Sequence, residues 1–285
     1  MQTQERKQRA LYESLARYEW LRRRLSGARA GERLDLHKRL TPPSRVDSGP
    51  GAGTSGLHAW MWQRLEASEN PRILDVGCGF GGTLIAWAQR CAGTYVGLGL
   101  SRYQLQRASQ QARSCGVAER CEFRRQSYDQ PIQDTFDRIV SVEALFHATD
   151  LPRALANLAR SLADGGRLVL VEDVASGPTT QDDAAAQMLI QAWGNACIHD
   201  IDAWHAAAAH AGLAIDRSYD LSEQVPARQE VVLARSERRL RRFRRACPLR
   251  SGRLVADAFL GGIALERLYG KRLLRYLCLV LRVPA

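Results

Sequence analysis

An acidic and a basic side chain lie four residues apart just after an apolar segment, residues 136–142. They are Glu143 and His147. If the segment that holds them winds as a helix, residues at i and i+4 share one face and reach the same ligand. A carboxylate or an imidazole placed in this way can act as a general base. The structural alternatives are that Glu143 hydrogen-bonds to a cofactor or a covering segment, and that His147 caps a helix or stabilises the loop.

Four glycines within six residues follow a short apolar run that contains one acid. In order, the residues are Ile73, Leu74, Asp75, Val76, Gly77, Cys78, Gly79, Phe80, Gly81 and Gly82. We expect a strand, a tight turn and the start of a helix, because glycine adopts positive φ and lets a ligand lie against bare backbone. The first N–H groups of such a helix are free to bind a ligand. The turn therefore predicts a nucleotide-like ligand.

The spacing of Gly77, Gly79 and Gly82 also matches the dinucleotide motif G-x-G-x-x-G, which is a weak indication by itself. A dinucleotide site needs an acid about 20 residues further on, at the end of the second strand, to bind the ribose hydroxyls. Gly99 and Leu100 occupy that point of the sequence. Because neither residue is acidic, a dinucleotide is disfavoured.

Five segments, in order along residues 67–175, resemble the class I S-adenosylmethionine-dependent methyltransferases of the small-molecule, natural-product type. The segments are 72–83 with D-x-G-x-G, 96–105 with Leu-Ser and Gln, 121–128, 136–147, and 158–173 with Gly-Gly before an apolar run. The resemblance implies a methyl-transferring enzyme, S-adenosyl-L-methionine as its cofactor, and an α/β fold with a Rossmann-like seven-stranded sheet. It places Glu143 and His147 beside the reactive methyl group. The cofactor-binding residues that it implies are Asp75, Gly77, Cys78, Gly79, Gly81, Gly99, Leu100, Ser101, Gln104, Ser127, Tyr128 and Val142.

Two positions depart from the pattern of this family. Gly99 stands where the family usually has the acid that binds the ribose, and Ser127 stands where it usually has the acid that binds the adenine. We expect the ribose hydroxyls to bind Ser101, Gln104 or backbone carbonyls, and Ser127 to contact the adenine amino group. A hydrogen bond to a charged group is worth more than one between neutral groups, so we expect a modest affinity for the cofactor.

The segments on either side of this core predict further helices. Apolar residues recur with the 3.6-residue helical period over residues 5–26, and this helix is expected to cover the mouth of the site. The residues of the apolar stripe are Leu11, Leu15, Tyr18, Leu21 and Leu25. We expect four parts, namely a helical N-terminal cap (1–66), a cofactor-binding core (67–221), a helical lid inserted before the last strand (222–270), and that strand (271–285).

The net charge of +11 is distributed unevenly along the 285 residues. Residues 67–221 carry 13 basic and 18 acidic side chains, residues 1–66 carry 13 and 7, and residues 222–285 carry 15 and 5. The flanking segments therefore hold all of the excess positive charge. This distribution suits an acidic or phosphorylated acceptor, or a nucleic acid.

The first hypothesis for the acceptor is a small, largely apolar metabolite that is methylated on oxygen, nitrogen or carbon. The alternative is C-methylation of an isoprenyl diphosphate, because geranyl-diphosphate-type C-methyltransferases are similar in carrying a glutamate at the position of Glu143. The basic run 238–245, with Lys38, Arg39 or Arg45, would then bind the phosphates. The same run also fits a helix with solvated charges.

An interpretation from another class is a nucleic-acid-binding module that has kept the fold. Residues 141–147 lack the Asn-Pro-Pro-Tyr type of loop found in base-methylating enzymes. The sequence also has no basic strand with interleaved aromatic residues for stacking on bases. Nucleic acid is therefore disfavoured as a partner.

Cysteine and histidine spacings predict no metal site. The seven cysteines form no C-x-x-C pair, and the spacing of His199, His205 and His210 gives no common ligand face. No apolar run reaches the roughly 20 residues that span a bilayer. The N-terminus has no signal-peptide core, so we expect a cytoplasmic protein, and the sequence leaves a homo-oligomer open.

Overall fold

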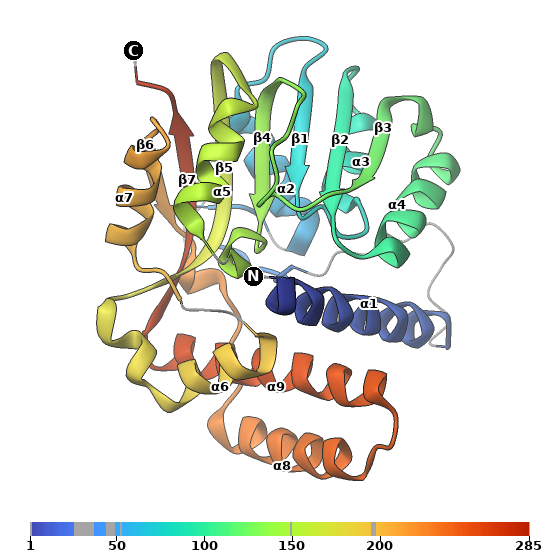
Figure 1. The fold of residues 1–285 in the computed structure, drawn as a ribbon, viewed down its shortest axis with the longest axis vertical. Helices are drawn as coiled ribbons and strands as arrows, with labels where there is room; N and C mark the ends of the chain where they lie inside the picture. The colour runs from blue at the N-terminus through green and yellow to red at the C-terminus, as the bar shows by residue number, and fades with distance from the viewer. Residues whose placement is uncertain are drawn as a thin grey trace.

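The computed structural model describes residues 2–25, 37–43, 49–51, 53–148, 150–194 and 198–284. These residues form a seven-stranded sheet of order β3-β2-β1-β4-β5-β7-β6, in which β7 runs antiparallel to both of its neighbours (Figure 1). The predicted fold class is confirmed. The strands are β1 (Arg72–Val76), β2 (Thr94–Gly99), β3 (Cys121–Arg125), β4 (Phe136–Val142), β5 (Leu162–Ala175), β6 (Ala214–Asp220) and β7 (Leu274–Arg282).

Helices cover both faces of the sheet (Figure 1). Ile73 of β1 packs into the core formed with α2 and α3, whereas Leu74 packs into the core formed with α5 and α7. The two residues go to opposite faces because successive side chains of a strand alternate. Burial on both faces explains why these strands are almost continuously apolar. The covering helices are α2 (Gly53–Leu65), α3 (Gly82–Ala88), α4 (Arg102–Ser114), α5 (Leu151–Arg160) and α7 (Ile201–His210).

Four further helices gather beyond the carboxyl ends of the parallel strands (Figure 1). They are α1 (Gln2–Leu25), α6 (Ala184–Trp193), α8 (Glu230–Ala246) and α9 (Arg250–Gly270). Ligands of open α/β sheets bind at this edge, so these helices cover the expected site. Short 3₁₀ helices complete the described elements, namely η1 (Ala118–Arg120), η2 (Leu145–His147), η3 (Pro178–Asp182) and η4 (Ser222–Gln224).

The structure differs from the sequence-based expectations in two helical segments. The apolar stripe of α1 is buried at Leu11, but Leu21 and Leu25 are 50% and 79% exposed. The far end of this helix extends beyond the elements on which it packs, so its apolar residues there face solvent (Figure 1). The helical stretch expected after residue 223 is two helices, because Pro248 interrupts it between α8 and α9.

Candidate active site

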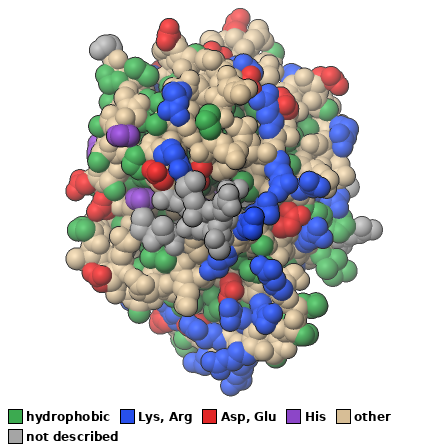
Figure 2. Space-filling view, viewed as in Figure 1, with side chains coloured by type: hydrophobic (Ala, Val, Ile, Leu, Met, Phe, Trp, Pro, Cys, Tyr) green, Lys and Arg blue, Asp and Glu red, His purple; other side chains and the backbone are tan. Residues whose placement is uncertain are grey.

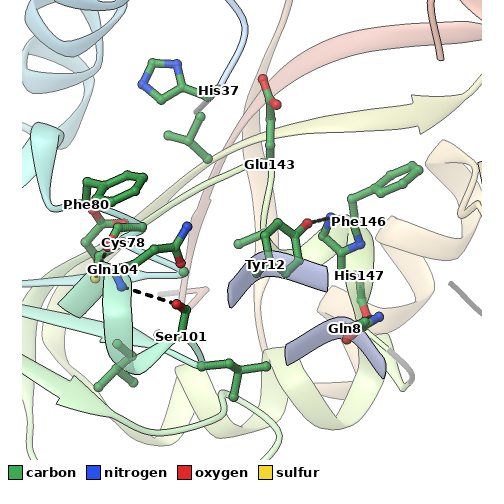
Figure 3. Close-up of a pocket in the computed structure, with 18 of the residues that line it drawn as sticks. Gln8, Tyr12, His37, Cys78, Phe80, Ser101, Gln104, Glu143, Phe146 and His147 are labelled. Carbon is green, nitrogen blue, oxygen red and sulfur yellow. Dashed lines mark hydrogen bonds between the residues drawn. The ribbon is translucent and has the colours of Figure 1, made fainter. Parts of the chain in front are cut away.

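A cavity of about 220 Å³ lies between the carboxyl ends of the parallel strands and the helix α1 (Figure 3). Twelve of the fourteen residues predicted from the sequence line it. The ten that were expected to bind the cofactor are Asp75, Gly77, Cys78, Gly79, Gly99, Leu100, Ser101, Gln104, Tyr128 and Val142. The two that were expected to take part in catalysis, Glu143 and His147, line another part of the same cavity.

The glycine turn after β1 has the backbone that its sequence predicts. Gly77, Gly79 and Gly81 have φ values of 78°, 53° and 74°, which favour glycine. A Cβ atom on Gly77 would lie 2.3 Å from the Cβ atom of Ala144, whereas a Cβ atom on Gly79 would meet no atom within 4 Å. Gly77 therefore lets the β4 loop approach, and Gly79 presents bare backbone to the cavity. This arrangement suits a nucleoside ligand that lies against the turn.

Two of the predicted cofactor residues, Gly81 and Ser127, do not line the cavity. A Cβ atom on Gly81 would lie 2.6 Å from the ring of Phe123, so this glycine permits packing between the turn and β3. Ser127 is buried, and its Oγ accepts a hydrogen bond of 3.2 Å from the backbone N–H of Asp129. The neighbouring residues Gln126 and Tyr128 line the cavity instead.

The loop that holds Glu143 and His147 is not α-helical, so the expected shared helical face is wrong. Glu143 has a left-handed backbone with φ of 55°, and η2 follows it as a short 3₁₀ helix. The left-handed residue turns the chain sharply at the end of β4. Both side chains still reach the cavity, but they come from different directions and have different partners (Figure 3).

A buried carboxylate, Glu172 of β5, holds this loop in place. Its oxygens accept hydrogen bonds from the hydroxyl of Ser141 at 2.8 Å and from the backbone N–H groups of Leu145 and Phe146 at 3.0 and 3.1 Å. Burial raises the pKa of Glu172 to about 7 even though these donors act to lower it. The loop conformation therefore depends on an acid that the sequence pattern did not single out.

Glu143 belongs to a buried network with one cation and two carboxylates. Its Oε1 atom accepts hydrogen bonds of 2.8 Å from the backbone N–H of Lys38 and from the hydroxyl of Tyr276. The ammonium of Lys38 lies 3.4 Å from the same oxygen and 2.8 Å from Oδ2 of Asp173. Asp173 also accepts a hydrogen bond from the hydroxyl of Tyr269. The network fixes the carboxylate of Glu143 at the cavity wall.

The three charged groups of this network differ in how burial and the neighbouring charges balance in their pKa values. Burial acts to raise the pKa of Glu143, but Lys38, His37 and two hydrogen bonds outweigh it, so that pKa lies below its ordinary value. For Asp173, burial and the nearby Glu143 outweigh Lys38 and raise the pKa. For Lys38, the two carboxylates outweigh burial and raise the pKa. Glu143 is therefore the ionised acid at neutral pH.

A second group of side chains in the cavity surrounds His147. Tyr12 of α1 is hydrogen-bonded to its Nε2 atom, and Gln8 donates a 3.2 Å hydrogen bond to its backbone carbonyl. The ring of Trp193 lies 5.5 Å from the imidazole between centroids. Burial, then Glu143 and Glu172, raises the pKa of Tyr12, which keeps the phenol neutral. The helix α1 thus closes this side of the site.

Several lining residues were not anticipated from the sequence. Asp173 follows an apolar run near the carboxyl end of β5, which is a recognisable signal in an α/β sheet. Tyr12 and Gln8 lie on the predicted covering helix, but the periodic pattern did not distinguish them, and Trp193 carries no local signal. The remaining unanticipated residues include His37 and Ala258.

The cavity lining contains no lysine or arginine among the residues that the structure describes. Arg39 is exposed, and Arg45 lies outside the described residues. The run 238–245 belongs to α8 and does not reach the cavity. The described part of the chain also holds no cluster of three potential metal-ligating side chains. None of its helices has the length and apolar character needed to cross a membrane.

Comparison with known proteins matches this architecture. A family model described as "Methyltransferase domain" matches residues 74–170. Over 187 residues the chain is 32% identical to the methyltransferase GfsG of Streptomyces halstedii, covering 64% of this chain and 66% of that protein. The chain belongs to the class I S-adenosylmethionine-dependent methyltransferases. S-adenosylmethionine is therefore its cofactor, and the glycine turn and the end of β2 are the cavity-lining elements that would hold it.

Other members of this methyltransferase family share shorter segments or the fold alone. The chain is 36% identical to 24-methylenesterol C-methyltransferase 2 of Oryza sativa subsp. japonica over 110 residues, which cover 38% of this chain and 30% of that protein. A solved structure of geranyl diphosphate methyltransferase with GPP and sinefungin superposes with a TM-score of 0.67 at 18% identity, covering 87% and 88% of the two chains. The chain thus spans less than a third of this sterol relative and about two thirds of GfsG.

Proposed function

We propose that this methyltransferase methylates a carbon atom of a small, largely apolar and uncharged acceptor, and that Glu143 removes the proton which the methylated acceptor must lose. The observation that carries the proposal is the ionised carboxylate of Glu143 in a cavity whose described lining has acids and aromatic rings but no lysine or arginine. Such a lining stabilises positive charge that develops on the acceptor. The sterol C-methyltransferase relative supports an apolar acceptor.

The atoms of Glu143 are arranged for this role. Its hydrogen bonds from described residues, and the contact with the ammonium of Lys38, all reach Oε1. No described residue donates to Oε2, which is therefore the oxygen available to take a proton. Lys38 and Tyr276 hold the carboxylate in one orientation while this second oxygen stays unoccupied, as a positioned base requires.

The lowered pKa of Glu143 indicates which kind of acceptor group this carboxylate can deprotonate. A proton is transferred efficiently when the base matches the acidity of the group that loses it. A weak base of this kind is poorly matched to a neutral hydroxyl group, which holds its proton strongly. It is sufficient for the strongly acidic C–H bond next to a carbocation. Methyl addition to a carbon–carbon double bond, followed by loss of that proton, is the chemistry that fits Glu143 best.

The chain otherwise contributes position and exclusion of water. S-adenosylmethionine supplies an activated methyl group on a sulfonium centre. The glycine turn holds the ligand, and the loop from Glu143 to His147 orients its acidic and aromatic side chains toward the space beyond it (Figure 3). Tyr12 and Trp193 close the acceptor side. Alignment of this kind can supply roughly 7 to 11 kcal/mol of the reduction in activation barrier.

C-methylation of an isoprenyl diphosphate is less favoured. Diphosphates are bound in proteins by lysine, arginine or bridging cations. Lys38 is already paired with two carboxylates, and the arginines of α8 lie at the far end of the molecule from the sheet, where Figure 2 shows Lys and Arg side chains gathered on the surface. The positive flanks of the sequence therefore do not converge on the cavity within the described residues.

The proposal is tested with trideuteromethyl-labelled cofactor and three acceptor classes, namely an apolar alkene such as a sterol, a phenol, and a prenyl diphosphate. We expect labelled product from the alkene, with a carbon-bound CD3 group and loss of one acceptor proton. Transfer only to the phenol oxygen would refute the carbon assignment. Turnover of the diphosphate but of neither neutral acceptor would refute the uncharged acceptor. Failure of S-adenosylhomocysteine to bind at millimolar concentration would refute the enzyme function itself.

A further inference from the structure

A carboxylate from α1 stands at the carboxyl end of β2, where the strand itself ends in Gly99. The hydroxyl of Ser101 donates a 2.5 Å hydrogen bond to Oε2 of Glu13, and the backbone N–H of Tyr103 donates to the same oxygen at 3.3 Å. Burial acts to raise the pKa of Glu13, but these two donors and Arg17 outweigh it and lower the pKa. An ionised acid is therefore present at this point of the sheet, although β2 does not provide it.

The packing around β2 is close at both of its glycines. A Cβ atom on Gly97 would lie 2.7 Å from Sγ of Cys78, so a side chain there would have to displace its neighbour. A Cβ atom on Gly99 would lie 3.2 Å from Cδ2 of Leu105. An acid at position 99, where nucleoside-binding second strands usually carry one, would therefore require Leu105 to shift by a few tenths of an ångström.

The hydrogen-bonding capacity of Ser101 determines what it can offer to a ligand. A serine hydroxyl has one hydrogen and two acceptor sites. The hydrogen is donated to Glu13, and one acceptor site receives the backbone N–H of Gln104 at 3.2 Å. Ser101 lines the cavity, so the acceptor site that remains can face a ligand. Its partner must be a donor, and the negative charge of Glu13 strengthens such a bond.

We propose that Glu13, acting through Ser101, supplies the ribose recognition that β2 lacks, so that a ribose hydroxyl of the cofactor donates to Oγ of Ser101. Glu13 is a positioning residue in this scheme and Ser101 is the group that touches the ribose. The proposal rests on the proposed function, since it requires an adenosyl cofactor. It makes α1 a part of the cofactor site as well as a cover for the acceptor side.

A purely structural role for Glu13 is the alternative, because its hydrogen bonds also join α1 to the start of α4. The two helices have an independent contact further along. The ring of Trp20 on α1 lies 4.3 Å from the guanidinium of Arg107 and 6.4 Å, between centroids, from the ring of Tyr103, both of which belong to α4. Removal of the charge of Glu13 should therefore leave α1 in place, whereas Trp20→Ala weakens its attachment without changing the hydrogen bonds of Ser101.

Calorimetry with two probes separates these roles. The probes are S-adenosylhomocysteine and its 2′,3′-dideoxyribose analogue. We expect Glu13→Gln to weaken binding of the first probe by up to about tenfold, because a neutral amide polarises the hydroxyl of Ser101 less than a carboxylate does. Binding of the dideoxy probe should change less than about twofold, because it has no ribose hydroxyl to donate. Trp20→Ala should weaken the binding of both probes by equal factors.

A control and a double variant make the outcome decisive. Glu19→Gln removes another carboxylate of α1, one that is paired with Arg22 at 2.8 Å, and should leave both affinities unchanged. In a Ser101→Ala background, Glu13→Gln should have no further effect on S-adenosylhomocysteine. Equal losses for the two probes, or no loss with either, would overturn the proposal while leaving the methyltransferase function intact. Absence of binding by the unmodified chain would overturn both.

Discussion

Tyr12 and Glu13 are neighbours on α1, yet they contact opposite sides of the cavity. Tyr12 is hydrogen-bonded to His147 on the proposed acceptor side, whereas Glu13 accepts a hydrogen bond from Ser101 at the end of β2. Two adjacent residues of one helix thus contact both parts of the cavity. We therefore expect α1 to affect both the proposed cofactor side and the proposed acceptor side, and substitutions on this helix should separate the two effects.

Replacement of Glu143 by Gln should remove the proposed base and retain the shape of the side chain. Loss of a general base reduces the rate by about 10²- to 10⁴-fold, so kcat should fall by this amount with little change in the affinity for S-adenosylhomocysteine. Glu119→Gln, at an exposed position, serves as the control. A variant with unchanged kcat would show that Glu143 is not the base.

Tyr12→Phe should lower kcat roughly tenfold, the equivalent of one ordinary hydrogen bond. The imidazole of His147 would keep its contact with Trp193 but lose the phenol hydroxyl. Tyr18→Phe on the same helix is the matched control, because Tyr18 packs against Phe259 and is partly exposed. Steady-state kinetics and calorimetry distinguish the outcomes. An equal loss of cofactor affinity would contradict a role confined to the acceptor side.

The raised pKa of Glu172 predicts a dependence of stability on pH. The carboxyl of Glu172 has a pKa of about 7 in the folded chain, whereas in the unfolded chain it has its ordinary pKa of about 4.5. The raised pKa therefore contributes on the order of 3 kcal/mol to the free energy of unfolding. This contribution is fully present below pH 4.5 and is lost as the pH rises through 7. Urea unfolding of the unmodified chain and of Glu172→Gln should show this difference between pH 4.5 and 7.5. The same dependence of unfolding free energy on pH in both proteins would contradict the prediction.

Lys38→Met should destabilise the fold because it leaves two neighbouring buried carboxylates without their cation. Removal of one partner of a buried ion pair costs about 3 to 5 kcal/mol. The loss should be smaller at pH 5 than at pH 8, since Asp173 has a raised pKa and can take up a proton. Lys271→Met breaks an ion pair with Asp183 in which the lysine is 50% exposed, and should cost less than about 1 kcal/mol. Equal losses of unfolding free energy in the two variants would show that the buried network does not stabilise the fold.

Gly77→Ala should abolish cofactor binding and destabilise the turn. The added methyl group would lie 2.3 Å from the Cβ atom of Ala144 at a backbone φ of 78°. Gly116→Ala is the control, because its φ is 71° but no atom lies within 4 Å of the added carbon. The control should lose only about 1 kcal/mol of stability from backbone strain. Thermal unfolding and calorimetry of both variants provide the comparison. Similar losses of stability and cofactor affinity in the two variants would show that the contact with Ala144 is not the cause.

Local patterns predicted the elements that carry the cofactor site. The strand, the glycine turn and the helix around Gly77 follow from residue types that act over a few positions, and so does the continuous burial of β1. The face shared by Glu143 and His147 was predicted wrongly. The conformation of that loop depends on Glu172, which lies in a different strand and forms hydrogen bonds with the backbone of the loop.

The sequence by itself determined the fold, the family and the glycine turn that we expect to bind the cofactor, because these depend on periodicity and on short motifs. The tertiary structure alone decided which charges meet at the site. Lys38 lies 105 residues from Glu143 in the chain, and Glu13 lies 88 residues from Ser101. Contacts over such separations depend on how helices pack on the sheet. For this reason the acid missing at Gly99 was visible in the sequence, whereas the carboxylate of Glu13 that stands near it was not.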